Sequence, residues 1–152
     1  MIYKAYYNSE IGLIEIKGSE NGIISLDFAE SESDAVTVMP EFLKECVSQL
    51  DEYFKGNRRE FDVKLDIQGT EFQKKVWREL TNIPYGATET YRGIAVAVGN
   101  PKAVRAVGSA NHCNKIAILI PCHRVIGSNG NLTGYAGGLW RKEWLLKHEK
   151  IH

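Results

Sequence analysis

The apolar pattern of the chain changes its period at Pro40, and this change most restricts the possible folds. Before Pro40, the runs "IYKAYY", "LIEIKG" and "GIISLDF" alternate like strands, and "SENG" is typical of a hairpin turn. After Pro40, apolar residues recur every three or four positions up to Gly56, which predicts an amphipathic helix with Cys46 in the core. "EFDVKLDI" alternates again and predicts a further strand of the same small sheet.

The rest of the chain has helical spacing. "TEFQKKVWREL" begins at Thr70 with Gln73 three positions later, which predicts a capping box. "LWRKEWLLKHE" predicts a last helix, with Leu139, Trp144 and Leu146 facing inward. With Gly69 as the boundary, we expect an α+β protein: an N-terminal lobe over 1–68, with an antiparallel sheet and a helix, then an all-helical lobe over 69–152.

Two short helices in the second lobe are joined by a Gly-Asn-Pro turn. "TETYRGIAVAVG" ends at Gly99, and Asn100 and Pro101 suit the N-cap and first position of the helix "PKAVRAVGSANH". This order favours a helix-turn-helix, although any αα-hairpin has a similar pattern. The small side chains of the second helix would let it approach a neighbouring helix or the floor of a DNA groove.

Charge and cysteine content limit the classes of protein. Residues 1–69 hold seven Lys and Arg against fourteen Asp and Glu, a net charge of −7, whereas residues 70–152 hold twelve against five, a net charge of +7. The basic half suits contact with a polyanion, and two differently charged solvated faces are the alternative. Three cysteines cannot form a complete set of disulfides, and no run reaches a membrane-spanning length or resembles a signal peptide. We therefore expect a protein without a membrane segment that is cytoplasmic, or nuclear if the organism is eukaryotic.

The segment "AILIPCHRVIG" ends an apolar run on Cys122, His123 and Arg124. Basic neighbours lower a thiol pKa and so favour the nucleophilic thiolate. In an extended chain, however, adjacent side chains point to opposite faces, so His123 could act on Cys122 only across a kink at Pro121 or through a water. A structural cysteine beside a surface histidine is the simpler alternative.

A zinc site is the other interpretation of these residues. The pairs His112-Cys113 and Cys122-His123 lack the ligand spacing of zinc sites, and the first lobe holds one cysteine and no histidine. We therefore expect neither a metal nor another cofactor.

The second lobe closely resembles the O6-alkylguanine-DNA alkyltransferases, the methylated-DNA–protein-cysteine methyltransferases. The resemblance rests on "IPCHRVIGSNGNLTGYAGGLWRKEWLLKHE", "GTEFQKKVWRELTNIPYGATETY" and "AVGNPKAVRAVGSANHCN", about the last 85 residues. It weakens over 1–68, where it implies a ribonuclease H-like lobe. It implies repair by one irreversible transfer of an alkyl group from guanine O6 in duplex DNA to Cys122.

The resemblance also implies a role for each site residue. His123 would be a base acting through a water, Glu149 would orient it, and Asn114 would hold the hydrogen-bond geometry. The family flips the damaged nucleotide through the minor groove. The implied DNA-binding residues are Tyr91, Lys102, Arg105, Ala106 and Gly108, with Arg105 filling the gap in the base stack and Tyr91 rotating the 3′ phosphate.

The implied base pocket contains Val125, Tyr135 and Ala136. Many relatives have serine at Ala136, so a hydroxyl contact to O6 is lost here. Thr90 and Lys115 replace a common serine and proline, and neither change removes a chemical role. The implied partner is duplex DNA with O6-alkylguanine, with O4-alkylthymine as a second candidate, bound by a monomer.

Three other functions fit parts of the pattern. An alkyltransferase-like protein binds damage without reacting, but its cysteine is typically replaced by tryptophan. A helix-turn-helix regulator could use Cys122 as a sensor, although no separate effector domain is visible. A hydrolase with a Cys-His pair would turn over repeatedly.

Overall fold

The computed structural model describes residues 1–33 and 38–152. The chain divides into two compact units: residues 1–67 with His152, here the N-terminal unit, and residues 68–151, the C-terminal unit. The predicted α+β fold class is confirmed, since a small antiparallel sheet with one helix precedes a mainly helical unit.

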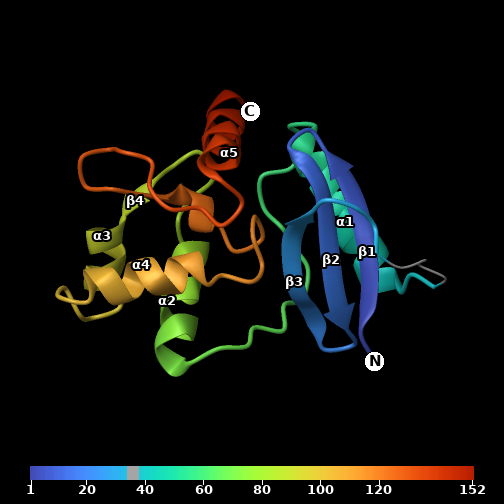
Figure 1. Cartoon of the computed structure of the whole chain (residues 1–152), viewed down its shortest axis with the longest axis horizontal. Helices are drawn as coiled ribbons and strands as arrows, with labels where there is room; N and C mark the ends of the chain where they lie inside the picture. The colour runs from blue at the N-terminus through green and yellow to red at the C-terminus, as the bar shows by residue number, and fades with distance from the viewer. Residues whose placement is uncertain (34–37) are drawn as a thin grey trace. The chain divides into compact units, whose positions relative to one another are not determined.

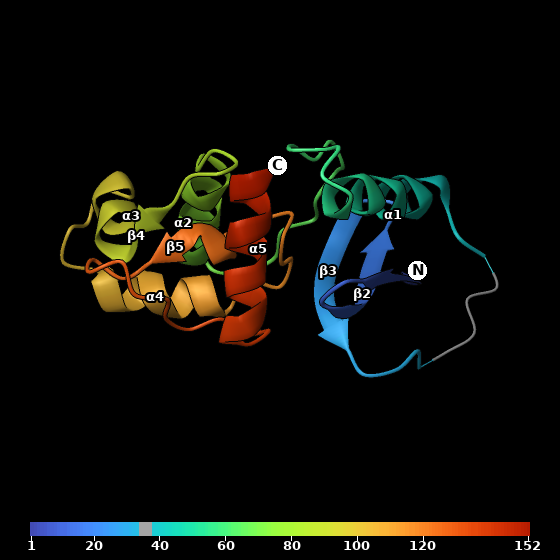
Figure 2. The same cartoon turned by 90° about the horizontal axis from the view of Figure 1, so that it is seen from above.

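The N-terminal unit is a three-stranded sheet with a helix on one face (Figures 1 and 2). Strands β1 (Tyr3–Ser9), β2 (Gly12–Ser19) and β3 (Gly22–Ala29) pair antiparallel in chain order. Helix α1 (Glu41–Phe54) follows, as its apolar spacing predicts. The core consists of fully buried side chains from both layers: Ala5, Ile14, Ile16, Leu26, Leu43, Cys46, Leu50 and Tyr53.

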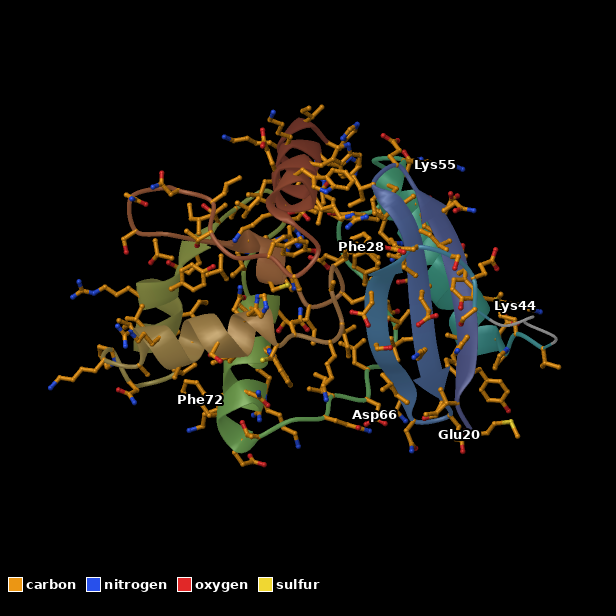
Figure 3. All side chains as sticks on the ribbon, in the orientation of Figure 1. Glu20, Phe28, Lys44, Lys55, Asp66 and Phe72 are labelled. Atoms are coloured by element: carbon orange, nitrogen blue, oxygen red, sulfur yellow. The ribbon has the colours of Figure 1, made fainter. Side chains whose placement is uncertain are left out.

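The further strand predicted from "EFDVKLDI" is reduced to a single parallel bridge between Leu65 and Ile23. Ile23 N donates to Lys64 O at 2.8 Å, and Asp66 N donates to Ile23 O at 2.8 Å. Figure 3 shows Asp66 at the same end of the sheet as Glu20 in the β2–β3 turn. The prediction of a full strand is wrong because none of residues 61–68 is buried, so little apolar contact stabilises a longer ladder.

The C-terminal unit packs four α-helices around a second core. They are α2 (Glu71–Thr81), α3 (Tyr91–Ala97), α4 (Val104–His112) and α5 (Leu139–Ile151). A two-residue parallel pairing of β4 (Glu89–Thr90) with β5 (Val125–Ile126) adds a small strand element. Trp77 Nε1 donates to Ala110 O at 2.8 Å and ties α2 to α4. No helix in the described ranges is long and apolar enough to cross a membrane.

The capping box at Thr70 is confirmed, but the helix predicted from Pro101 begins three residues later. Gly99 closes α3 in the left-handed region with φ 84°. Ala103 N then donates to Asn100 O at 2.9 Å, and Ala103 has non-helical dihedral angles. The hydrogen bond between Ala103 and Asn100 closes a turn ahead of the first helical residue, Val104. Pro101 and Lys102 therefore lie in this turn and not in α4.

The inward face of α5 also differs from the prediction. Leu145 is fully buried, whereas Leu139 is 48 % exposed, so Leu139 does not face inward as predicted. The other buried positions of α5 are Lys142, His148 and Glu149. Because this buried face is largely polar, the apolar pattern alone could not locate it.

Candidate active site

An asparagine organises the loop that leads into the "PCHR" segment. Asn114 Nδ2 donates to Ile120 O at 2.8 Å, and Asn114 Oδ1 accepts from Ile116 N at 3.0 Å. Between them, Ile118 has φ 70°, a conformation that β-branched residues rarely adopt. Local strain of this kind persists only where the surroundings fix it, and the Asn114 bonds and the burial of Ile118 do so here.

Cys122 begins a short 3-10 helix, η1 (Cys122–Arg124). Pro121 has φ −80° and ψ 63°, and Arg124 N donates to Pro121 O at 3.0 Å. The chain is therefore turned and not extended at this point, so Cys122 and His123 need not point to opposite faces. His123 is fully buried, and Cys122 is 6 % exposed.

A buried cluster of charges joins η1 to α5. His123 Nε2 lies 2.7 Å from Glu149 Oε2. Arg124 donates to the same carboxylate twice, from Nε to Oε1 at 2.7 Å and from Nη2 to Oε2 at 3.0 Å. Its third nitrogen, Nη1, donates to Ile83 O at 2.8 Å. Arg124 is thus paired with Glu149, a partnership that its place in the sequence beside the cysteine did not indicate.

These contacts define which ring nitrogen of His123 can act as a base. Burial raises the pKa of Glu149, but His123 and Arg124 together hold this pKa well below its usual range, so the carboxylate is ionised. An ionised carboxylate only accepts hydrogen bonds, so Nε2 carries the proton that it shares with Glu149. Burial lowers the pKa of His123 and favours the neutral ring. Nδ1, which has no hydrogen-bond partner among the described residues, then holds a lone pair.

The environment of Cys122 combines opposing influences. Burial raises the pKa of the thiol, while a hydrogen bond from Asn114 and the charge of Lys142 lower it. Burial therefore favours the neutral thiol of Cys122, and Asn114 and Lys142 favour the nucleophilic thiolate.

Lys142 is a site residue that the sequence did not reveal. It is fully buried on α5, and its Nζ donates to Thr133 O at 2.7 Å in the glycine-rich loop, residues 127–138. Burial lowers its pKa to about 8, and Cys122 partly offsets this. Tyr91 Oη also donates to Thr133 O, at 3.2 Å, so α3, α5 and the loop meet here. A lysine in a helix of mixed charge gives no signal in one sequence, since most lysines are exposed.

The residues predicted to bind DNA lie on or beside α4. Lys102, Arg105 and Ala106 are exposed. Gly108 faces Tyr91, because a Cβ at Gly108 would lie 4.0 Å from Tyr91 Cδ1. The surface of α4 therefore combines one arginine with very small residues and borders on the tyrosine of α3.

The three predicted pocket residues have different environments. Tyr135 is buried, burial raises its pKa well above 10, and its hydroxyl has no partner within the described ranges. Ala136 is exposed. Val125 is fully buried and pairs with Glu89 between β5 and β4. The described residues form no group of three or more metal-binding side chains.

Comparisons with known proteins match both units of the chain. Residues 71–151 match the family model of the 6-O-methylguanine DNA methyltransferase, DNA binding domain, and residues 2–67 match that of its ribonuclease-like domain. The chain is 52 % identical over 153 residues to a methylated-DNA–protein-cysteine methyltransferase of Methanosarcina acetivorans, which covers 97 % of this chain and 98 % of the relative.

Solved structures give the same result. The crystal structure of the Mycobacterium tuberculosis O6-methylguanine methyltransferase matches with a TM-score of 0.89 and 44 % identity, over 99 % of this chain and 94 % of that one. Mycobacterium tuberculosis OGT in complex with DNA matches with a TM-score of 0.89 and 46 % identity, over 98 % and 93 %. The fold and the matches in both units define a DNA-repair methyltransferase class with a cysteine acceptor. The chain belongs to the 6-O-methylguanine DNA methyltransferase family.

Proposed function

We propose that this protein repairs DNA by transferring the alkyl group of O6-alkylguanine to Cys122, once per molecule. The thiol proton passes to Nδ1 of His123, directly or through a water. The sulfur then attacks the alkyl carbon, so that the S–C bond forms as the C–O6 bond breaks. The electron pair of that bond stays on the purine, which takes up a proton and becomes guanine. Because the thioether is stable, the protein is consumed.

The observation that carries this proposal is the orientation of His123. Its Nε2 faces an ionised carboxylate that two arginine nitrogens also hold, so its lone pair is on Nδ1, which is free of protein partners among the described residues. A buried neutral imidazole with a free nitrogen, adjacent to a cysteine, is suited to general-base activation of a thiol.

The DNA step rests on α4. We propose that α4 enters the minor groove, which is about 6 Å wide, with Arg105 replacing the extruded base and Lys102 contacting phosphate. Tyr91, beside Gly108, would turn the backbone of the flipped nucleotide, and Tyr135, Ala136 and Val125 would line the base pocket. Contacts to backbone and shape suit a protein that searches for lesions in any sequence.

Intact-mass measurement and peptide mapping test the transfer. After incubation with a duplex carrying O6-methylguanine, we expect one added methyl group per molecule, located on Cys122 and absent in Cys122→Ser. Tight binding to the lesion with unchanged mass would instead identify a damage-binding protein. Product in excess of protein would identify an enzyme that turns over.

A second experiment tests the role of Arg105. Arg105→Ala should slow repair of the duplex at least several-fold, while the reaction with free O6-benzylguanine stays nearly unchanged, because only the duplex requires flipping. Lys147→Ala, on the exposed face of α5, is the matched control. Equal losses on both substrates would rule out the proposed role.

Several finer properties stay predictions. Activity on O4-alkylthymine and action as a monomer derive from the family resemblance. A cytoplasmic location is a prediction from the odd number of cysteines. The absence of metals and cofactors is likewise an expectation, and repair in the presence of a chelator would test it.

A further inference from the structure

We infer that Arg124 is a positioning residue that keeps His123 uncharged and correctly turned, so that the ring can accept the thiol proton of Cys122. The inference rests on the proposed function, because it explains how His123 remains a base. It concerns a residue that touches neither the sulfur nor a substrate in that proposal.

The geometry singles out Arg124 as the main partner of the Glu149 carboxylate. Two guanidinium nitrogens bind the two carboxylate oxygens at 2.7 and 3.0 Å, while His123 reaches one oxygen at 2.7 Å. The third guanidinium nitrogen is fixed on Ile83 O at 2.8 Å, and the Tyr85 ring lies 5.7 Å from Arg124 Cζ. All three charged or polar side chains are nearly excluded from solvent.

A buried histidine beside a lone carboxylate tends to take up a proton and form an ion pair. An imidazolium cannot accept the proton of Cys122. Here burial lowers the pKa of His123, Glu149 opposes this, and the positive charges of Arg124 and Lys142 support it. Arg124 supplies the positive charge that Glu149 needs, so His123 remains neutral and keeps the lone pair of Nδ1 away from Glu149.

Titration of the His123 ring by NMR tests this without any substrate. The His123 signal is identified among those of the four histidines by its loss in a His123→Gln variant. In Arg124→Met the pKa of His123 should rise, because Glu149 loses its other cation. In Arg124→Lys, which keeps the charge, it should stay near the wild-type value. In Arg124→Met with Glu149→Gln it should fall again. Arg78→Met, at an exposed arginine of α2, is the matched control and should leave it unchanged.

The pH dependence of the reaction with free O6-benzylguanine gives the second readout. For Arg124→Met the acid side of the pH–rate profile should move to higher pH. Each pH unit of this displacement should lower the relative rate at acidic pH about tenfold. Arg124→Lys should react more slowly at every pH, since one amine cannot replace the bidentate fork, with little displacement of the profile.

Each outcome has a defined meaning. An unchanged His123 titration in folded Arg124→Met would overturn the inference, and so would a raised pKa in Arg124→Lys, which keeps the test valid if the methionine variant does not fold. In Arg124→Met, a rate loss that is equal at all pH values would indicate a purely structural role and also overturn it. If the wild-type protein transferred no alkyl group but the titration moved as expected, the proposed function would fail and the effect of Arg124 on His123 would stand.

Discussion

At the scale of single residues, the site is governed by buried polar side chains whose charges depend on one another. Cys122, His123, Lys142 and Glu149 are all buried, and burial disfavours the charged form of each. Specific partners then decide the outcome: Arg124 and His123 keep Glu149 ionised, while Asn114 and Lys142 favour the thiolate of Cys122. The reactivity of the cysteine is thus a property of the cluster.

Removal of the Lys142 charge should change the pH at which Cys122 reacts. Because the ammonium group lowers the thiol pKa, Lys142→Met should raise this pKa, and the rate of alkylation by iodoacetamide should rise only at higher pH. Peptide mapping separates Cys122 from the exposed Cys113. Lys147→Met is the control, since Lys147 pairs with Glu143 on the exposed face. An identical pH midpoint in Lys142→Met and wild type would contradict the assignment.

Asn114→Ala should destabilise the C-terminal unit and slow Cys122. The change removes the side-chain acceptor of Ile116 N, while Ile120 O still accepts from Cys122 N at 2.8 Å, and it should cost roughly 1–3 kcal/mol of unfolding free energy. Urea denaturation measures the loss, and iodoacetamide labelling measures the reactivity. Asn131→Ala, at an exposed position of the glycine-rich loop, should change the free energy of unfolding very little. A loss as large as that of Asn114→Ala would contradict the role of the Asn114 hydrogen bonds.

At the scale of elements, the turn between β2 and β3 is fixed by its contact with the segment before the C-terminal unit. Gly22 has φ 127°, and a Cβ there would lie 2.7 Å from Lys64 O, next to the bridge between Ile23 and Leu65. Both the dihedral angle and the space therefore require glycine. The bridge between Ile23 and Leu65 is a single residue pair, so it depends on the close approach of Gly22 to Lys64.

Gly22→Ala should lower the free energy of unfolding by roughly 1–3 kcal/mol from the dihedral angle, with a further loss from the contact with Lys64. Gly130→Ala is the comparison, because Gly130 also has a positive φ, 82°, but a Cβ added there would meet no atom within 4 Å. We expect the loss in Gly22→Ala to be larger. Thermal or urea unfolding measures both variants. Equal losses would mean that the contact with Lys64 contributes nothing.

At the scale of the whole molecule, charge is divided between the two units. The net charges of −7 over residues 1–69 and +7 over 70–152 change sign close to the structural division after residue 67. A net charge of zero thus conceals a basic unit that contains α4. Contacts of Lys and Arg with DNA phosphates release counterions, so the affinity of the protein for DNA must fall as the salt concentration rises.

We expect the slope of log binding constant against log salt concentration to become less steep by about one for each phosphate contact removed. Lys102→Ala should have this effect on an undamaged duplex, measured by fluorescence anisotropy. Lys44→Ala, on α1 of the acidic unit, should leave the slope unchanged. If both changes reduced the slope equally, DNA contact would not be confined to the basic unit.

The fold class, most element boundaries and the residues that share a motif could all be predicted from the order of amino acids. Apolar period, capping residues and glycines act over a few neighbouring residues, so one strand, one helix or one turn can be predicted from its own letters. The same locality explains the errors. The bridge at Leu65 and the inward position of Leu145 depend on packing between segments. The later start of α4, at Val104, depends on the turn that Ala103 N closes on Asn100 O.

How the site works became apparent only from the packed chain. Residues 25 and 26 positions apart, Arg124 and His123 with Glu149, meet on one carboxylate. Lys142 turns inward from a helix that has no apolar stripe to indicate its face. Burial and the distances between charges set protonation, and both arise only when distant segments pack together.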